Sequence, residues 1–531
     1  MRHRRSVLVL VALAVVLAGC GGLPGSVPDT PDTGSVTTAP PTPPSTTAGP
    51  GPDGETPTPA PEATPTSFDY ADPGRDRLGW EGGYWHNESV AVDRSDGLND
   101  AELAAVVNRS MARVEYVRGL EFERPVPVEV ISRAAYRNRT DGRSYSSADR
   151  LHQNVKWEAT FMIGESTDAL GVQDRNRGAA VRGFYSPADE RIVVVSENAS
   201  DPELDEITLA QELFHALQDQ RFGLAGFDQS TRELHNARDG VIEGDGNYVD
   251  HLYEQRCGAE WDCLSPRESG SSSSSGGSPD VHVGLYQVTY QPYSDGVVFV
   301  QERRQRLGWD GVDALYERPP NSTEQTIHPA LYGVDEPAPI AVPDRSADRW
   351  RVPDVGPVDY AAFGEAGLFV TLWYPSYVES QAAGRPRDVV IPYRAHLNYT
   401  PDGSELAELD PYSYSHPASA GWGRDRLVPY VTNDSAATNE TGYVWKTVWD
   451  SPSDARQFAD AYVALLAYHN ATDVDAETDG PGTVYRIPEG EPFADAFRVV
   501  RANDTVVVTN APSVAELRAV RDPPDAIRSE E

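Results

Sequence analysis

The chain is poor in lysine, cysteine and methionine. Only Lys156 and Lys446 are lysines among 531 residues, and there are three cysteines and three methionines. Asp and Glu number 82 against 45 Lys and Arg, so the formal net charge is −37 at pH 7. This shortage of positive charge excludes nucleic acid and anionic lipid surfaces as electrostatic partners, because both are bound through clustered Lys and Arg.

The acidic excess points to a high-salt environment. At ordinary ionic strength so many like charges repel one another and loosen a compact fold. In molar salt the Debye length falls to about 3 Å, and neighbouring surface charges hardly interact. The composition therefore predicts the protein of a halophile.

The N-terminus has the pattern of an export signal. Arg2, Arg4 and Arg5 precede an apolar run over residues 7–18, which is too short for a membrane span. Leu17-Ala18-Gly19-Cys20 follows and resembles a lipobox, so we expect residues 1–20 to be a lipoprotein signal peptide and Cys20 to be lipidated. Arg4-Arg5 also permits twin-arginine export. An uncleaved signal anchor is the alternative.

Once Cys20 is assigned to lipid, Cys257 and Cys263 remain as a pair outside the cytoplasm. We expect them to form a disulfide, because exported proteins meet oxidising conditions. The alternative is a two-cysteine metal site, but no partner Cys or His with finger-like spacing is nearby.

Residues 21–67 consist mainly of Pro, Thr, Ser, Gly and Ala, which cannot bury enough apolar surface to fold. They predict a disordered stalk that holds the rest away from the membrane. Sequons for N-glycosylation are more frequent than chance predicts and indicate a glycosylated exterior. They lie at Asn87, Asn108, Asn138, Asn198, Asn321, Asn398, Asn433, Asn439, Asn470 and Asn503.

Periodicity divides the remaining chain into two α+β regions. In residues 68–339 we expect a helix over 100–117, strands over 126–131 and on both sides of a turn at 187–189, and a flexible Ser/Gly insert at 269–278. In residues 340–531 we expect helices over 358–373 and 452–468 and a hairpin whose turn includes Asn503. We also expect three tryptophans to fill the core of this second region: Trp422, Trp445 and Trp449.

Residues 208–222 carry the pattern of a zinc metallopeptidase helix with one ligand replaced. Such a helix places two histidines at i and i+4 on one face, with a glutamate between them that polarises the metal-bound water. Here the first histidine position holds Gln211, whereas Glu212 and His215 are present. A neutral amide binds metal weakly, so we expect a large loss of zinc affinity. Asp201 as the N-cap, Pro202 in the first turn and Gly223 at the end bound the predicted helix.

A second predicted helix, over residues 236–256, supplies Glu243 as the candidate third ligand. It lies 28 residues beyond His215, a distance compatible with a ligand helix packed behind the first. His235 and His251 lie near this helix and are candidates to replace the missing imidazole. Further along, Glu324 and His328 are candidates for lining a cleft.

These motifs together resemble a family of glutamate-zincin-like metallopeptidase lipoproteins found in bacteria and as haloarchaeal surface proteins. The resemblance covers residues 120–520. It implies a zincin-like fold with His215 and Glu243 as ligands and Glu212 as general base, and it places the family's first ligand at Gln211. The matching motifs are Leu209 to Phe222, Glu243 to Asp245, Pro292 to Val300, Gly308-Trp309, Pro319 to Pro329, Phe363 to Glu365, Gly421 to Arg426 and Trp449 to Ser451.

From the sequence we predict a lipid-anchored, glycosylated protein on the extracellular face of the cell membrane. Its α+β, zincin-like ectodomain is expected to need no cofactor and to bind polypeptide or a cell-envelope protein rather than cleave it. One alternative is an active zinc peptidase in which Gln211 or another histidine completes the site. A second alternative is a structural component of the envelope.

Overall fold

The computed structural model describes residues 73–93, 98–140, 144–181, 183–196, 205–265, 281–347, 349–474 and 480–521. The strands are β1 (Trp80–Glu81), β2 (Tyr84–Trp85), β3 (Val128–Ser132), β4 (Gly183–Ser186), β5 (Arg191–Ser196), β6 (Trp422–Val431), β7 (Thr441–Trp449), β8 (Thr472–Asp473), β9 (Thr483–Arg486), β10 (Ala496–Ala502) and β11 (Thr505–Ala511). The helices are α1 (Asp100–Arg118), α2 (Arg133–Thr140), α3 (Ser147–Glu158), α4 (Ala169–Ala180), α5 (Glu206–Phe222), α6 (Arg232–Glu254), α7 (Val283–Glu317), α8 (Thr323–Ile327), α9 (Gly364–Ala383), α10 (Ser435–Thr438), α11 (Pro452–Tyr468) and α12 (Leu517–Val520), with short 3₁₀ turns η1 (Leu224–Gly226), η2 (Pro329–Leu331) and η3 (Tyr393–His396).

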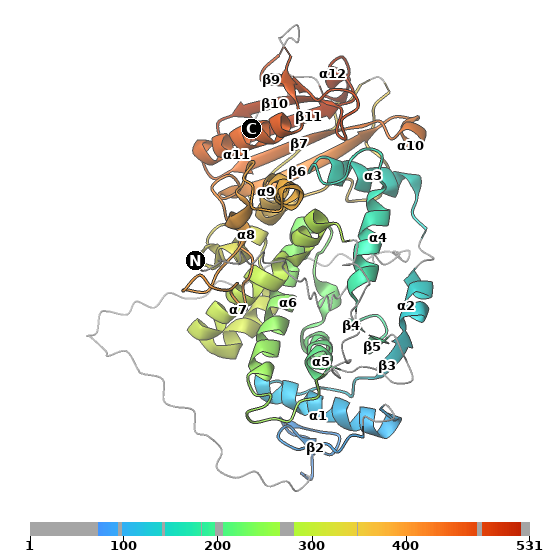
Figure 1. Cartoon of the computed structure of the whole chain (residues 1–531), viewed down its shortest axis with the longest axis vertical. Helices are drawn as coiled ribbons and strands as arrows, with labels where there is room; N and C mark the ends of the chain where they lie inside the picture. The colour runs from blue at the N-terminus through green and yellow to red at the C-terminus, as the bar shows by residue number, and fades with distance from the viewer. Residues whose placement is uncertain are drawn as a thin grey trace, which may run out of the picture.

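The structure confirms the α+β class and has two unequal parts (Figure 1). A six-stranded antiparallel sheet, in the order β6-β7-β11-β10-β9-β8, forms one end of the molecule. The other end is mostly helical, with α1, α5, α6 and α7 packed beside a small sheet in the order β3-β5-β4. In the small sheet β3 pairs with β5 in parallel, whereas β4 pairs with it antiparallel.

Successive side chains along the strands of the large sheet point to opposite faces, and each face packs against a different apolar core. Val506 and Val508 face the core that also contains α9 and α11, whereas Val507 faces a smaller core with Val520 of α12. This follows from the two-residue period of a strand. The three predicted core tryptophans, Trp422, Trp445 and Trp449, are at most 2% exposed.

The larger core also includes residues from early in the chain. Val155 and Trp157 of α3 and Phe161 in the following loop pack in one cluster with α9, α11 and the sheet. Helix α3 contacts β6 and β7, and Figure 1 shows it beside these strands while α4 runs back toward the small sheet. The predicted boundary near residue 340 therefore does not separate two independent cores.

Several predicted elements are confirmed and others begin elsewhere. The turn between β4 and β5, the β10–β11 hairpin with Asn503 at φ +50°, and α11 lie where expected. The helix predicted over 358–373 begins at Gly364, because Ala361 instead bridges to Leu427 of β6. In the described part of the chain, no helix has the length and apolar character needed to cross a membrane. The predicted signal peptide, Cys20, the stalk and the 269–278 insert lie outside the described residues.

Candidate functional site

Helix α5 carries the Gln211-Glu212-x-x-His215 motif. It begins at Glu206, with Asp205 as its N-cap: the Asp205 Oδ1 accepts the backbone N–H of Ile207 at 3.3 Å. The predicted cap was Asp201, four residues before the observed cap at Asp205, so the predicted start was too early. Asp201 and Pro202 themselves lie outside the described residues. The helix ends at Gly223, as predicted, where a φ of +69° favours glycine.

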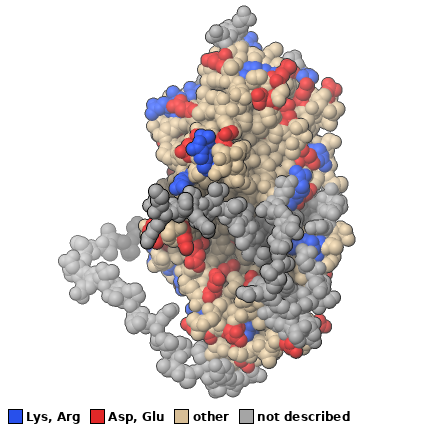
Figure 2. Space-filling view, in the orientation of Figure 1, with Lys and Arg blue, Asp and Glu red and all other residues tan. Residues whose placement is uncertain are grey.

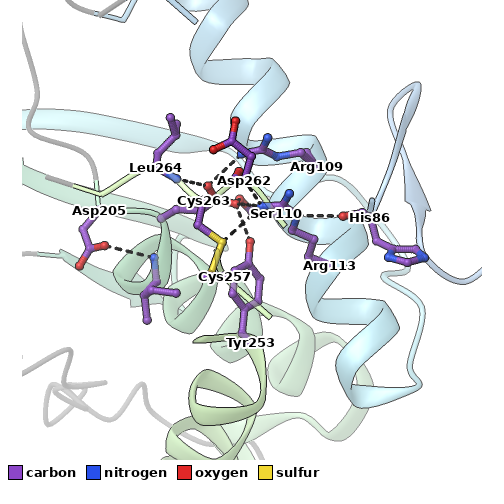
Figure 3. Close-up of polar contacts among 12 residues, drawn as sticks. His86, Arg109, Ser110, Arg113, Asp205, Tyr253, Cys257, Asp262, Cys263 and Leu264 are labelled. Carbon is purple, nitrogen blue, oxygen red and sulfur yellow. Dashed lines mark hydrogen bonds and ion pairs between the residues drawn. A yellow bond between two sulfur atoms is a disulfide. The ribbon is translucent and has the colours of Figure 1, made fainter. Parts of the chain in front are cut away.

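The first turn of α5 is anchored by a buried ion-pair network (Figure 3). The Glu206 carboxylate is fully buried and pairs with Arg109 of α1 at 2.8 Å and with Arg113 of the same helix. It also accepts the hydroxyl of Tyr253 from α6 and the backbone N–H of Leu264, both at 2.7 Å. The network fixes α5 against the two helices on either side, which in turn sets the position of the motif.

The structure brings His215 and Glu243 together. The Nε2 of His215 lies 3.4 Å from the Oε2 of Glu243, and both residues are at most 1% exposed. Neither atom has a hydrogen-bond partner. Gly246, one turn after Glu243, leaves room for the ring, because a Cβ there would lie 3.3 Å from His215 Cε1.

Gln218, one turn beyond His215, orients the imidazole. Its Oε1 lies 2.8 Å from His215 Nδ1, while its Nε2 donates to the carbonyl of Ile242 and to the hydroxyl of Tyr316. Because the amide nitrogen is engaged elsewhere, the imidazole Nδ1–H must donate to the amide oxygen. This orientation turns Nε2 toward Glu243, as a metal-ligating histidine requires.

The electrostatics of the site are those of a buried cation–anion cluster. Burial lowers the pKa of His215, but the carboxylates of Glu243 and Glu212 outweigh this effect and raise it to about 10. Burial is also the main reason that the pKa of Glu212 rises to about 7. A protonated imidazole therefore supplies positive charge between carboxylates in the metal-free protein.

Glu212, the predicted general base, is partly engaged by the neighbouring strand. Its Oε2 accepts the backbone N–H of Tyr185 in β4 at 2.7 Å, and its Oε1 is buried without a hydrogen-bond partner. Strand β4 is an edge strand, whereas β5 is paired on both sides. An extended peptide that pairs with this sheet must therefore add to β4 or to β3, the other edge strand, and not to β5.

Gln211 occupies the position of the missing ligand and turns toward a neighbouring amide. It is 4% exposed, and its Nε2 lies 3.4 Å from the Oδ1 of Asn247 in α6. Neither candidate replacement histidine lies at the site. His235 pairs with Asp239 at 2.9 Å, and His251 contacts Gln255 and Glu408.

The donor set fits a metal only in part. Two ligands bound at about 2.0–2.1 Å in a tetrahedron lie roughly 3.3 Å apart, close to the 3.4 Å between His215 Nε2 and Glu243 Oε2. Among the described residues, however, no third His, Cys, Asp or Glu completes a group with them in which all ligand atoms lie within 4.8 Å of one another. Two protein ligands are fewer than the three or four of known zinc sites.

Sequence reasoning missed Asp250. Its Oδ1 is buried without a hydrogen-bond partner, and its electrostatic neighbours are His215, Glu212 and Glu243. The signal was its spacing: it follows Glu243 by seven residues, which is two turns along the same face of α6. Asp245, by contrast, faces away and pairs with Arg118 at 3.1 Å.

The structure places Glu324 and His328 in a different group. His328 Nε2 lies 3.1 Å from Glu365, and Glu233 at the start of α6 accepts the hydroxyl and the N–H of Thr323 in α8. Glu233 and Glu243 are ten residues apart on one helix, or about 15 Å. The contacts of Glu324 and His328 are therefore not those of the His215 site.

The predicted disulfide is present. Cys257 and Cys263 are bonded, with Cα atoms 5.4 Å apart, in the loop that follows α6 (Figure 3). Leu264, which binds Glu206, comes directly after this loop, so the disulfide supports the network that anchors α5.

The predicted glycosylation sites differ in accessibility. Asn138, Asn321, Asn433, Asn470 and Asn503 are exposed. Asn87, Asn108, Asn398 and Asn439 are half-buried, and Asn198 lies outside the described residues. The amide of Asn439 is used within the fold, because it donates to the carbonyl of Glu165 and accepts from Asn154.

A cavity of about 300 Å³ lies elsewhere, between the start of α6 and β6. Its walls include Glu233, Tyr360, Trp422, Arg424 and Arg426. None of the predicted ligand or base residues lines it.

Comparison with known proteins adds one match. Residues 351–521 match a family model described as "Domain of unknown function (DUF8575)". No curated protein and no solved structure matches the chain. The matched segment includes the large sheet, α9 and α11 but not the Gln211–Glu243 site, so the chain is similar to this family over its C-terminal third.

Proposed function

We propose that the protein is a lipid-anchored, glycosylated cell-surface protein with a degenerate, zincin-like metallopeptidase site, and that it binds polypeptide without cleaving it. The site geometry is the main support. His215 and Glu243 meet as two ligands would, but the position of the family's first ligand holds Gln211, whose amide contacts Asn247. Without a bound metal, no group lowers the pKa of the attacking water to near neutral, so hydrolysis is not expected.

Edge strand β4 supports a role in polypeptide binding. The N–H of Tyr185 in this strand donates to Glu212, so an extended peptide that pairs with this edge at Tyr185 would take over that donor and release the Glu212 carboxylate. Strand addition of this kind gives affinity through backbone hydrogen bonds. The export signal and stalk predicted from the sequence would present this edge outside the cell.

Gln211→His tests the proposal directly. In full-length protein purified in molar KCl, we expect the unaltered chain to hold far less than one equivalent of zinc, measured by elemental mass spectrometry. The substitution restores the missing histidine ligand, so zinc affinity should rise by at least roughly 100-fold, and one equivalent should bind. Gln211→Asn is the matched control, because it keeps a neutral amide and should not gain zinc.

An unaltered protein that contains one equivalent of zinc and cleaves peptides would contradict the proposal. Loss of that cleavage in Glu212→Gln would then establish the alternative, an active peptidase. One observation favours this alternative: the Oδ1 of Asp250 is buried without a hydrogen-bond partner, and His215 and Glu243 are among the electrostatic neighbours of this carboxylate.

A further inference from the structure

A second group of polar side chains lies away from the His215 site, where the loop after α3 meets the large sheet. Glu158 ends α3, Glu165 lies in the following loop, and Asp495 precedes β10. Each offers a carboxylate oxygen within 4.8 Å of the other two. Glu158 and Asp495 are buried, whereas Glu165 is half-buried and forms the side nearest solvent.

Asn510 of β11 contacts the group through Asp495. It is 1% exposed, and its Nδ2 donates to Asp495 Oδ2 at 2.9 Å, which fixes its amide against the carboxylates. Three oxygens are buried and have no hydrogen-bond partner: Glu158 Oε2, Glu165 Oε1 and Asn510 Oδ1. Unpaired acceptors cannot satisfy one another, because none of them carries a proton to donate. Their burial therefore calls for a cation or for added protons.

The protein supplies little positive charge here. Among the described residues, no ion pair joins a Lys, Arg or His to Glu158, Glu165 or Asp495. Arg486 lowers the pKa of the last two only from further away. Lys156, two residues before Glu158, lies instead over the ring of Trp157. Burial and the neighbouring carboxylates raise the pKa of Glu158 well above its usual range. Three carboxylates thus face a single arginine.

We propose that Glu158, Glu165 and Asp495, with the amide oxygen of Asn510, bind one Ca²⁺ ion. Carboxylate and amide oxygens are the ligands that Ca²⁺ prefers, and Ca–O distances of roughly 2.3–2.6 Å place opposite ligands about 4.8 Å apart. A divalent ion and Arg486 together neutralise the three carboxylates. Mg²⁺ fits less well, because it keeps several waters in its shell and these side chains are largely buried.

The ion joins two parts of the chain that are far apart in sequence. The loop of Glu165 already contacts the sheet region, through its backbone N–H to Pro492 and its carbonyl to Asn439. Glu158 follows Trp157, a residue of the larger core. Ca²⁺ therefore fixes this loop to the start of β10 and the end of β11, and it stabilises the core that both parts share.

Calcium titration of the full-length protein tests this site. After treatment with EGTA in 3 M KCl, the addition of 10 mM CaCl₂ should raise Tm by at least roughly 4 °C. Tb³⁺ should show luminescence sensitised by tyrosine, because Tyr443 is an electrostatic neighbour of both Glu158 and Asp495. Glu158→Gln should abolish the Ca²⁺-dependent rise in Tm while leaving Tm in EGTA unchanged or higher, because it removes a buried charge.

Two further variants keep the test decisive. Glu165→Gln, at the half-buried position, should weaken Ca²⁺ binding at least tenfold even if Glu158→Gln fails to fold. Asp450→Asn is the matched control: it lies in another carboxylate group, with Glu324 and Asp335, and should leave the response intact. Equal Tm in Ca²⁺ and EGTA, or an unchanged response in Glu165→Gln, would show that the carboxylates are neutralised by protons and would overturn the proposal.

Discussion

Glu206 shows how the role of one residue depends on partners that lie far away in sequence. In the sequence it follows Asp205 and precedes Ile207, and nothing in this local pattern marks it as part of a buried network. In the structure its carboxylate is bound by Arg109 and Arg113, which lie 97 and 93 residues earlier. No local pattern identifies such partners. The residues at i and i+4 on one helix face, by contrast, were predictable from helical geometry, and His215 and Glu212 lie as that geometry predicts.

Glu206→Gln should destabilise the protein strongly. The substitution removes the charge that two buried arginines require, and breaking a buried ion pair from one side costs about 3–5 kcal/mol. Urea unfolding at constant KCl measures the change in free energy. Glu121→Gln, at an exposed position beside α1, is the control and should change stability by less than about 0.5 kcal/mol. A similar small effect at both positions would show that the arginines are solvated or paired otherwise.

At the scale of elements, prediction succeeded where the signal is local. The stop at Gly223 and the turn between β4 and β5 depend on residues next to one another, and these boundaries agree with expectation. Helix α9 shows the limit. Its first residue, Gly364, has φ +71°, and a Cβ there would lie 1.6 Å from Glu233 Oε2. Contact with α6 and the bridge from Ala361 to β6 together set this start, and no periodicity in residues 358–373 reveals either.

The loop after α6 provides a test at the same scale. Replacing Cys257 and Cys263 together by Ser opens a short loop, and the entropic cost of a loop of this size predicts a loss of about 2 kcal/mol. Thermal unfolding of the double variant should therefore show a lower Tm, and adding a reductant should lower the Tm of the unaltered protein but not of the variant. Because the loop leads to Leu264, which binds Glu206, hydrogen exchange should also quicken at the first turn of α5. Unchanged hydrogen exchange there would show that the disulfide does not support the Glu206 network.

For the whole molecule, the acidic composition extends from the surface into the interior. Figure 2 shows red side chains spread across the visible face, with blue groups among them. Buried carboxyl groups also occur away from the candidate sites. Glu81 of β1 and Glu115 of α1 are neighbours, and burial is the main reason that their pKa values rise to about 7 and about 9. The sequence predicted the charged exterior but gave no sign of these internal pairs.

These two groups predict a stability that falls as pH rises. Their pKa values in the unfolded chain are near 4.5, so between about pH 4.5 and pH 9 the folded state holds more protons than the unfolded state. Their stabilising contribution is complete below that window and is lost as pH increases through it. In 3 M KCl, Tm should therefore be higher at pH 6 than at pH 8. Glu81→Gln should reduce the slope of stability against pH by about one bound proton. An unaltered slope would rule out Glu81 and Glu115 as the source of the pH dependence.

The joint core of α3 and the C-terminal sheet has a consequence during synthesis. Trp157 and Phe161 leave the ribosome long before β10 and β11, which complete the surface that covers them. At about 5–20 residues per second, these aromatic side chains stay uncovered on the nascent chain for on the order of half a minute. Throughout that interval the growing polypeptide exposes an aggregation-prone apolar segment. Folding without aggregation therefore depends on a chaperone or on a low content of apolar residues elsewhere in the first half of the chain.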